Sequence, residues 1–209
     1  MSSNTRRTFL KQSGVGVAGA AALSWTRPLI AKAANDKIVV GLIGCGGRGP
    51  GVASAMGGIA QVCDPDQKRL AGAAKRFAVK PSGAVTDLRR ILDDKSVDAV
   101  IIATPDHWHA PAAILACEAG KHVYVEKPCS HNFREGRLLL DAARRSQCVV
   151  QHGTQQRSSA FTANAIQMLR EGIIGDVLVA KAWNIQRRGN IGHARPSEPP
   201  AGVDYDMWV

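Results

Sequence analysis

The sequence has few aromatic residues and no clustered basic surface. Aromatic side chains make up 5% of the 209 residues, whereas proteins that bind nucleic acid combine a basic stripe with rings that stack on bases. The formal net charge is +10, but five of the 27 basic residues lie in residues 1–34, which contain no acidic residue. The other 22 basic residues are dispersed among 17 acidic ones. We therefore expect no nucleic-acid partner.

The cysteines show no metal-ligand spacing, and their odd number means that they cannot all pair. Most lie in apolar contexts, where a thiol packs as a small hydrophobe. His107 and His109 are spaced like a metal pair, but no cysteine or acidic cluster completes a ligand set. We therefore expect no metal site and five free, mostly buried thiols: Cys45, Cys63, Cys117, Cys129 and Cys148.

The N-terminus resembles an export signal. Arg6 and Arg7 are followed by an apolar run over residues 14–25 and by small residues around a cleavage position at residues 31–33. The run is too short to span a bilayer, so we expect no stable membrane anchoring. A disordered basic tail is the alternative. The order of the three parts predicts a twin-arginine signal peptide over residues 1–34, with the export machinery as partner and an exported or periplasmic protein that folds before transport.

From residue 37 onward, apolar runs alternate with helical patterns and short connections. This alternation predicts an α/β domain with a doubly wound parallel sheet, of the Rossmann type, over residues 35–150. The helix starts are marked by Pro65, expected in a first turn, and by Asp87, expected as an N-cap. The expected strands cover residues 37–43, 59–63, 84–85, 97–103, 122–125 and 148–151, and the expected helices cover residues 66–77, 88–92, 110–119 and 132–146.

The pattern changes after residue 151. We expect a helix over residues 160–171, a strand over residues 176–186 and then a Gly/Pro-rich stretch. One helix and one strand cannot bury their own apolar faces. We therefore interpret residues 151–209 as the beginning of a second, incomplete α/β domain.

A glycine-rich motif follows the first expected strand and opens a short helix. Asp64 lies 20 residues beyond its first glycine, at the end of the second strand. This context predicts a dinucleotide site, in which the glycines allow a tight turn, close approach of a pyrophosphate and close helix packing. An acidic residue here favours NAD over NADP, although Arg48 and Lys68 keep NADP as an alternative. The motif is Gly44-Cys45-Gly46-Gly47-Arg48-Gly49.

Two further polar motifs fall at strand ends. Thr104-Pro105-Asp106-His107-Trp108-His109 follows one strand and Glu126-Lys127-Pro128 follows another. Ligands of open α/β sheets bind outside the carboxyl ends of the strands, so these motifs should converge on one crevice. Trp108 is equally compatible with the core and with a wall of that crevice.

Together, the glycine loop, the Thr-Pro-x-x-x-His pattern and residues 120–128 (GKHVYVEKP) resemble the glucose–fructose oxidoreductase / inositol dehydrogenase (Gfo/Idh/MocA) family. The likeness extends from residue 37 to the end of the sequence. It implies an N-terminal Rossmann domain that binds NAD(P), and a C-terminal α/β domain that supplies most of the substrate site and often a homo-oligomer interface. Further catalytic residues of the family, commonly an Asp and a His, would lie beyond Val209.

The resemblance also implies roles for individual residues. Lys127 would be the active-site lysine, next to the nicotinamide and the reacting hydroxyl, and burial would favour its neutral form. Glu126 would contact the nicotinamide ribose. Asp106 stands where many relatives have Asn. The implied cofactor-binding set is Gly44, Gly46, Gly47, Arg48, Gly49, Asp64, Thr104, Pro105, His109, Glu126, Lys127, Gln155 and Arg157.

The implied activity is reversible hydride transfer between a nicotinamide cofactor and a sugar or polyol hydroxyl. Two alternatives remain: an NAD-dependent glycosidase that oxidises its sugar transiently, and a non-catalytic dinucleotide-binding protein. Similar glycosidases depart from Glu-Lys-Pro at the lysine motif, so Lys127 favours the dehydrogenase.

Overall fold

The computed structural model describes residues 37–184, 186–190 and 192–209. The predicted export signal lies outside these residues. The helices and strands are β1 (Val40–Ile43), α2 (Gly49–Met56), β2 (Ile59–Cys63), α3 (Gln67–Arg76), β3 (Ala84–Val85), α4 (Arg89–Asp93), β4 (Ala99–Ile102), α5 (Asp106–Glu118), β5 (His122–Glu126), α6 (Phe133–Ser146), β6 (Val150–Gly153), α7 (Ala160–Arg170) and α8 (Tyr205–Trp208), with 3₁₀ turns at Pro81–Gly83 and Gln155–Ser158.

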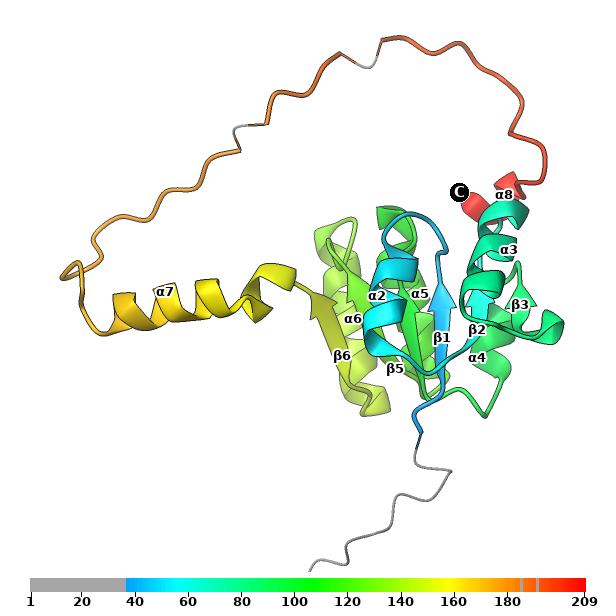
Figure 1. Ribbon diagram of the computed structural model, residues 1–209, viewed down its shortest axis with the longest axis horizontal. Coiled ribbons are helices and arrows are strands. Elements are labelled where there is room, and N and C mark those ends of the chain that lie inside the picture. Colours follow the sequence, from blue (N-terminus) through cyan, green and yellow to red (C-terminus); the bar gives the residue numbers. More distant parts are fainter. Residues whose placement is uncertain (1–36, 185, 191) are drawn as a thin grey trace, which may run out of the picture. The chain divides into compact units, whose positions relative to one another are not determined.

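The strands form one parallel sheet in the order β3-β2-β1-β4-β5-β6 (Figure 1). Every paired strand runs parallel to its neighbour, and β1 pairs with both β2 and β4. This order reverses direction between β1 and β4, where open α/β sheets bind ligands at their carboxyl edge. The predicted doubly wound Rossmann sheet is therefore confirmed.

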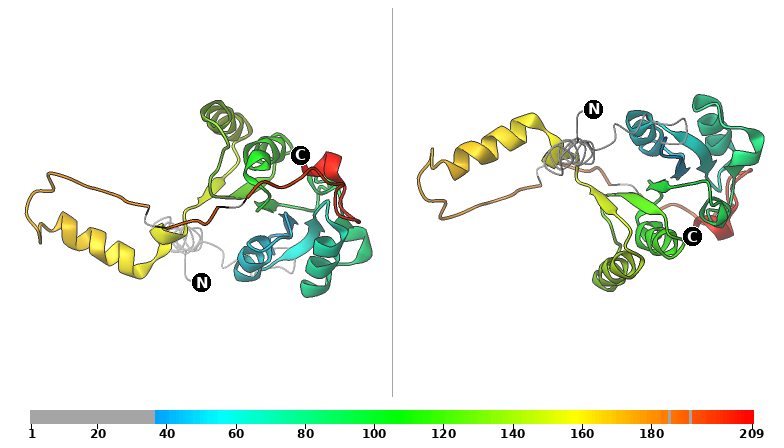
Figure 2. Two further views of the ribbon diagram at one scale, coloured as in Figure 1. Left: turned by 90° about the horizontal axis from the view of Figure 1, so that it is seen from above. Right: turned by 90° about the horizontal axis from the view of Figure 1, so that it is seen from below.

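Helices cover both faces of the sheet and bury two separate apolar clusters. Side chains of α4, α5 and α6 pack on one face around residues such as Ile91 and Ile102. Side chains of α2 and α3 pack on the other face around Leu42 and Val62. Figure 2 shows the two helix layers on opposite sides of the strands. Because the central strands are buried on both faces, nearly all of their residues are apolar, and their sequences are continuous apolar runs.

The element types within residues 37–153 match the sequence-based expectation, whereas several boundaries were wrong. α3 starts at Gln67, and the Asp66 carboxylate caps it by accepting from the amides of Lys68 and Arg69. Pro65 therefore precedes the helix instead of lying in its first turn. α5 begins at Asp106, four residues before its expected start, so the histidine motif lies on the helix and not in a loop.

The strand expected over residues 176–186 is absent from the described part of that stretch, residues 176–184 and 186. Its side chains are exposed, including Leu178 at 89% and Trp183 at 74%. A strand is stable only when a neighbour accepts and donates its backbone hydrogen bonds, and all six described strands pair within the sheet above. Within the described residues, no strand pairs with residues 176–184 and 186, so the alternating pattern there is not accompanied by strand structure.

In the described residues, no helix is long and apolar enough to cross a membrane. All five cysteines are free thiols. Cys45, Cys63 and Cys117 are buried as expected, whereas Cys129 and Cys148 are only partly buried.

Candidate cofactor and active site

The glycine motif forms a tight turn between β1 and α2. Gly44 has φ +91°, and a Cβ atom there would lie 2.6 Å from the carbonyl carbon of Ala103. A Cβ atom on Gly49 would lie 2.0 Å from the carbonyl oxygen of Gly44. Only glycine fits these two positions. No side chain caps the start of α2. Pro50 has no amide hydrogen, and the Gly51 and Val52 amides donate to the Arg48 carbonyl oxygen at 3.1 and 3.2 Å. The amides that could bind an anion such as a phosphate are therefore those of the glycine turn directly before α2.

Asp64, at the end of β2, is buried and faces this turn. One carboxylate oxygen accepts from the Cys45 amide at 2.7 Å, and the other accepts from the Asp66 amide at 2.9 Å. Asp64 therefore fixes the glycine turn to the β2 end. The interaction with a cofactor ribose, expected from the sequence, stays a prediction.

A cavity of about 220 Å³ lies outside the carboxyl ends of β1 and β2. We call it the β1–β2 cavity. It is lined by Ile43, Gly44, Gly46, Gly47, Cys63, Asp64, Pro65, Arg69, Thr86, Leu88, Ala103, Thr104, Pro105, Trp108, Met207 and Trp208.

A second hollow lies outside the carboxyl ends of β4 and β5, and Ala103 and Thr104 line both it and the first. We call it the β4–β5 hollow. Six of the eight residues that line it belong to the predicted site. Its lining is Arg48, Ala103, Thr104, Asp106, His109, Glu126, Lys127 and Gln155.

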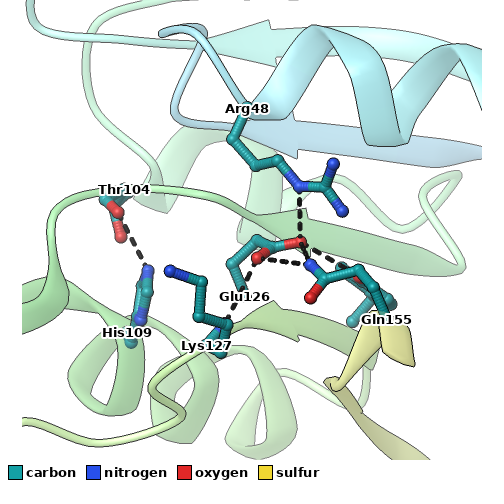
Figure 3. Close-up of polar contacts among 7 residues, drawn as sticks. Arg48, Thr104, His109, Glu126, Lys127 and Gln155 are labelled. Atoms are coloured by element: carbon teal, nitrogen blue, oxygen red, sulfur yellow. Dashed lines mark hydrogen bonds and ion pairs between the residues drawn. The ribbon is translucent and has the colours of Figure 1, made fainter. Parts of the chain in front are cut away.

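Glu126 connects the elements around the β4–β5 hollow (Figure 3). The carboxylate is 4% exposed. It accepts from Arg48 Nε at 3.0 Å and from Gln155 Nε2 at 2.8 and 2.9 Å. It also accepts from the Tyr124 hydroxyl at 3.1 Å and from the Lys127 amide at 3.3 Å. One buried carboxylate thus joins the glycine turn, β5 and the segment after β6.

The electrostatics of this cluster favour the ionised carboxylate. Burial alone would raise the pKa of Glu126, but hydrogen bonds from Arg48, Gln155 and Tyr124 outweigh it and lower that pKa below its usual 4.5. The same contact to Glu126 raises the pKa of Arg48. Burial, followed by the bond to Glu126, raises the pKa of Tyr124.

His109 connects the ends of β4 and β5 from within α5. It is 2% exposed. Its Nε2 lies 2.9 Å from the Thr104 carbonyl oxygen, and its Nδ1 contacts the carbonyl oxygen of Pro128. Both partners can only accept, so a neutral imidazole satisfies one of them and a protonated imidazole satisfies both. The geometry makes His109 a residue that positions two loops of the hollow.

Lys127 follows β5 directly and lines the β4–β5 hollow. Figure 3 shows its side chain extending beside His109 towards Thr104. The residue is exposed, so the burial expected for it from the sequence was wrong.

The predicted residues do not all meet in one place. The predicted residues of the β1–β2 cavity are Gly44, Gly46, Gly47, Asp64, Thr104 and Pro105, and Gly49 packs beneath the turn. Arg157 lies apart: it lines a different hollow beside Tyr124 and His152. It is absent from the linings of both the cavity and the β4–β5 hollow.

Several residues that line the two spaces or contact Glu126 were not predicted from the sequence, among them Tyr124, Arg69, Met207 and Trp208. Tyr124 was read only as part of a strand, although its position two residues before Glu126 on β5 puts both side chains on the same face. Arg69 lines the β1–β2 cavity and pairs with Asp66 at 3.2 Å. No local signal marked Met207 and Trp208, which come from the far end of the chain.

The residues present fit a dinucleotide. The Thr104 hydroxyl oxygen is buried and has no hydrogen-bond partner in the described part of the chain, and Thr104 lines both spaces. The glycine turn before α2 suits phosphates. No group of three or more His, Cys, Asp or Glu residues in the described chain could hold a metal ion.

Comparison with known proteins places this site in a class. Residues 38–154 match the Gfo/Idh/MocA family, described as an oxidoreductase family with an NAD-binding Rossmann fold. The match covers more than half of the chain and contains the glycine turn, Asp64 and the Glu126–Lys127 pair. The chain belongs to this family of NAD-binding oxidoreductases.

Two curated relatives and one solved structure illustrate the range of the family. A levoglucosan dehydrogenase of Pseudarthrobacter phenanthrenivorans is 34% identical over 125 residues, covering 60% of this chain and 32% of the relative. A glycosyl hydrolase family 109 protein of Saccharopolyspora erythraea is 31% identical over 210 residues, covering 83% of this chain and 44% of the relative. A levoglucosan dehydrogenase in complex with NADH has a TM-score of 0.58 and 32% identity, covering 66% of this chain and 40% of that one. The chain therefore spans less than half the length of these proteins.

Proposed function

We propose that the protein is an NAD(P)-dependent oxidoreductase that transfers a hydride between the nicotinamide and a hydroxyl-bearing carbon of a sugar or polyol. The observation that carries the proposal is the Glu126–Lys127 pair beside Thr104 and His109, in a hollow that adjoins the glycine turn. The relatives named as levoglucosan dehydrogenases support a sugar-type substrate.

Different residues of the site would contact different parts of the cofactor and the substrate. The glycine turn and Asp64 would hold the adenosine and phosphate half of the cofactor, and Thr104 and Glu126 the nicotinamide half. The bound nicotinamide supplies the hydride acceptor or donor. Lys127 would donate a hydrogen bond to the reacting oxygen and stabilise the charge that develops there. His109 keeps the loops carrying Thr104 and Lys127 at a fixed spacing.

Replacing Lys127 tests the catalytic role. In the protein as encoded by its gene, Lys127→Met should lower turnover by about 10²–10³-fold, because a positioned donor at the reacting oxygen is lost. NAD affinity should stay within a few-fold. The exposed Lys95 provides the matched control, and Lys95→Met should leave turnover unchanged. NADH formation with a panel of sugars and polyols is the assay, and full activity of Lys127→Met would remove Lys127 from the mechanism.

A second activity, glycosidic cleavage through transient oxidation, is favoured by a different observation. The family 109 glycosidase match extends over 83% of the chain, well beyond the Rossmann domain. Product analysis separates the two activities. A dehydrogenase accumulates NADH and an oxidised sugar, whereas the glycosidase releases a free sugar from a glycoside with no net change in NADH. Bound NAD without either product would indicate a non-catalytic protein.

We also propose export through the twin-arginine pathway, with residues 1–34 as the signal peptide. In the same proposal, residues 35–150 form the cofactor domain, and residues 151–209 are part of a substrate and oligomerisation domain. The paired Arg6 and Arg7 support export through the twin-arginine pathway. Replacing both with Lys should retain the protein in the cytoplasm without changing cofactor affinity. Undiminished export of this variant would refute the proposal. Size-exclusion chromatography with light scattering tests the expected homo-oligomer.

A further inference from the structure

Residues 202–208 return to the cofactor domain and bind along the carboxyl edge of the sheet. We call them the docked segment. The Gln67 amide donates to the Gly202 carbonyl oxygen at 3.0 Å, and the Asp204 amide donates to the Pro65 carbonyl oxygen at 3.0 Å. Between these bonds, Val203 forms an antiparallel bridge with Asp66. The segment thus attaches directly after the end of β2, beside Asp64.

The other end of the docked segment is held by α5. The Trp208 carbonyl oxygen accepts from His107 Nε2 at 2.8 Å and from Trp108 Nε1 at 3.2 Å. The Trp208 ring lies edge-on to His107, with centroids 5.6 Å apart, and stacks on Tyr205 at 6.0 Å. The segment is therefore anchored on both sides of the β1–β2 cavity, at the β2 end and at the start of α5.

Between its two anchors, the docked segment supplies part of the cavity wall. Met207 and Trp208 line the β1–β2 cavity together with Gly46, Gly47 and Asp64. In dinucleotide-binding sheets, the space beside the acidic residue at the end of β2 receives the adenosine. Large apolar side chains around such a space exclude water and contact the flat face of a base.

We propose that Met207 and Trp208 are adenosine-binding residues, and that the docked segment completes the adenine subsite from a position more than 140 residues beyond Asp64 in the sequence. His107 acts as a positioning residue, because it holds the Trp208 backbone. The proposal rests on dinucleotide binding by the family. It also implies reciprocity: an adenosine ligand stabilises docking of the segment by the same factor by which docking strengthens ligand binding.

The test uses two halves of the cofactor as separate probes. Binding of ADP-ribose and of nicotinamide mononucleotide to the 209-residue chain is measured by calorimetry. Trp208→Ala and Met207→Ala should each weaken the binding of ADP-ribose by about 5-fold to about 150-fold, the range that truncation of a residue stacked on a base produces. Affinity for nicotinamide mononucleotide should be unchanged. Trp183→Ala, which alters an exposed tryptophan away from the cavity, should change neither affinity.

Hydrogen exchange provides a readout that does not depend on the variants. Saturating ADP-ribose should slow amide exchange in residues 202–208 of the unaltered chain, and nicotinamide mononucleotide should not. Unchanged exchange, together with unaltered ADP-ribose affinity in both variants, would overturn the assignment while leaving the proposed function intact. Failure of the unaltered chain to bind ADP-ribose at all would refute both. Circular dichroism of Trp208→Ala identifies a loss of fold, in which case the exchange result on the unaltered chain decides.

Discussion

Substitution of Glu126 by Gln tests the central feature of the site, a buried carboxylate shared by the glycine turn and the segment after β6. The remaining amide oxygen can keep the contacts to Arg48, Tyr124 and Gln155. The amide nitrogen then replaces the oxygen that accepts from the Lys127 amide at 3.3 Å and from Gln155 Nε2 at 2.9 Å, so a donor faces donors.

The expected cost is about 1.5–2 kcal/mol of unfolding free energy at pH 7. Hydrogen bonds to a charged group contribute about 1.5–3 kcal/mol each, but the Arg48 side chain is 52% exposed, which reduces its ion pair to below about 1 kcal/mol. Most of the cost therefore comes from the unsatisfied donor and from weaker bonds to Gln155 and Tyr124. Urea denaturation followed by circular dichroism measures it.

The pH dependence gives the same prediction a second check. Because the folded pKa of Glu126 lies below its usual 4.5, the carboxylate contributes its full stability above about pH 4.5 and loses it as the pH falls through the folded pKa. The difference between wild type and Glu126→Gln should therefore be constant from pH 5.5 to 8 and shrink in acid. Glu118→Gln is the matched control, since Glu118 forms an ion pair at 3.9 Å with both side chains more than half exposed. Its cost should stay below about 0.5 kcal/mol. Equal stability of Glu126→Gln and wild type, or a difference undiminished in acid, would refute the reasoning.

Three further predictions follow from single contacts. Gly49→Ala should destabilise the fold by about 3 kcal/mol or more in urea denaturation, because its Cβ would meet a backbone oxygen, whereas Gly51→Ala, in open space, should be neutral or stabilising. Asp64→Ser should shift the ratio of NAD to NADP affinity towards NADP in paired titrations, because the repelling carboxylate is removed; an unchanged ratio would exclude Asp64 from the ribose site. At pH 8, iodoacetamide should modify Cys129 but spare Cys45 until the chain is denatured, because burial raises the pKa of Cys45 to about 12. Mass spectrometry of native and unfolded samples shows whether that order holds.

The features that the sequence predicted correctly are local ones. The turn at Gly44 needs a positive φ, and strand β2 is a short apolar run that ends at Asp64-Pro65, so nearby residues carry the signal. The α5 start was missed because Pro105 lies within the motif and Pro111 follows it, and prolines usually break helices. In the structure Pro105 occupies the N-cap position without a side-chain capping bond, and Pro111 is accommodated inside the helix.

The features that the sequence could not give depend on distant partners. Residues 176–186 alternate like a strand, but alternation reports amphipathicity and not the presence of a neighbour. The hydrogen bond between His107 and Trp208 joins residues 101 apart, and no periodicity encodes such a pairing. Likewise, the solvent exposure of Lys127 depends on which elements surround its loop, and the sequence pattern does not show this. Its position directly after β5 could be predicted, because the apolar run of the strand marks where the strand ends.

The strand order has a consequence for how the domain forms. β1 is central in the sheet, yet its pairing with β4 joins Val40 to Ala99 across a long stretch of chain. The glycine turn packs against Ala103, directly after β4, so it cannot reach its final shape until that stretch has been synthesised and its ends brought together. Closing such a loop costs entropy before any contact offsets it, and sheets dominated by distant pairings fold slowly. The glycine turn, although encoded early in the sequence, should thus be among the last parts of the first half of the sheet to become ordered.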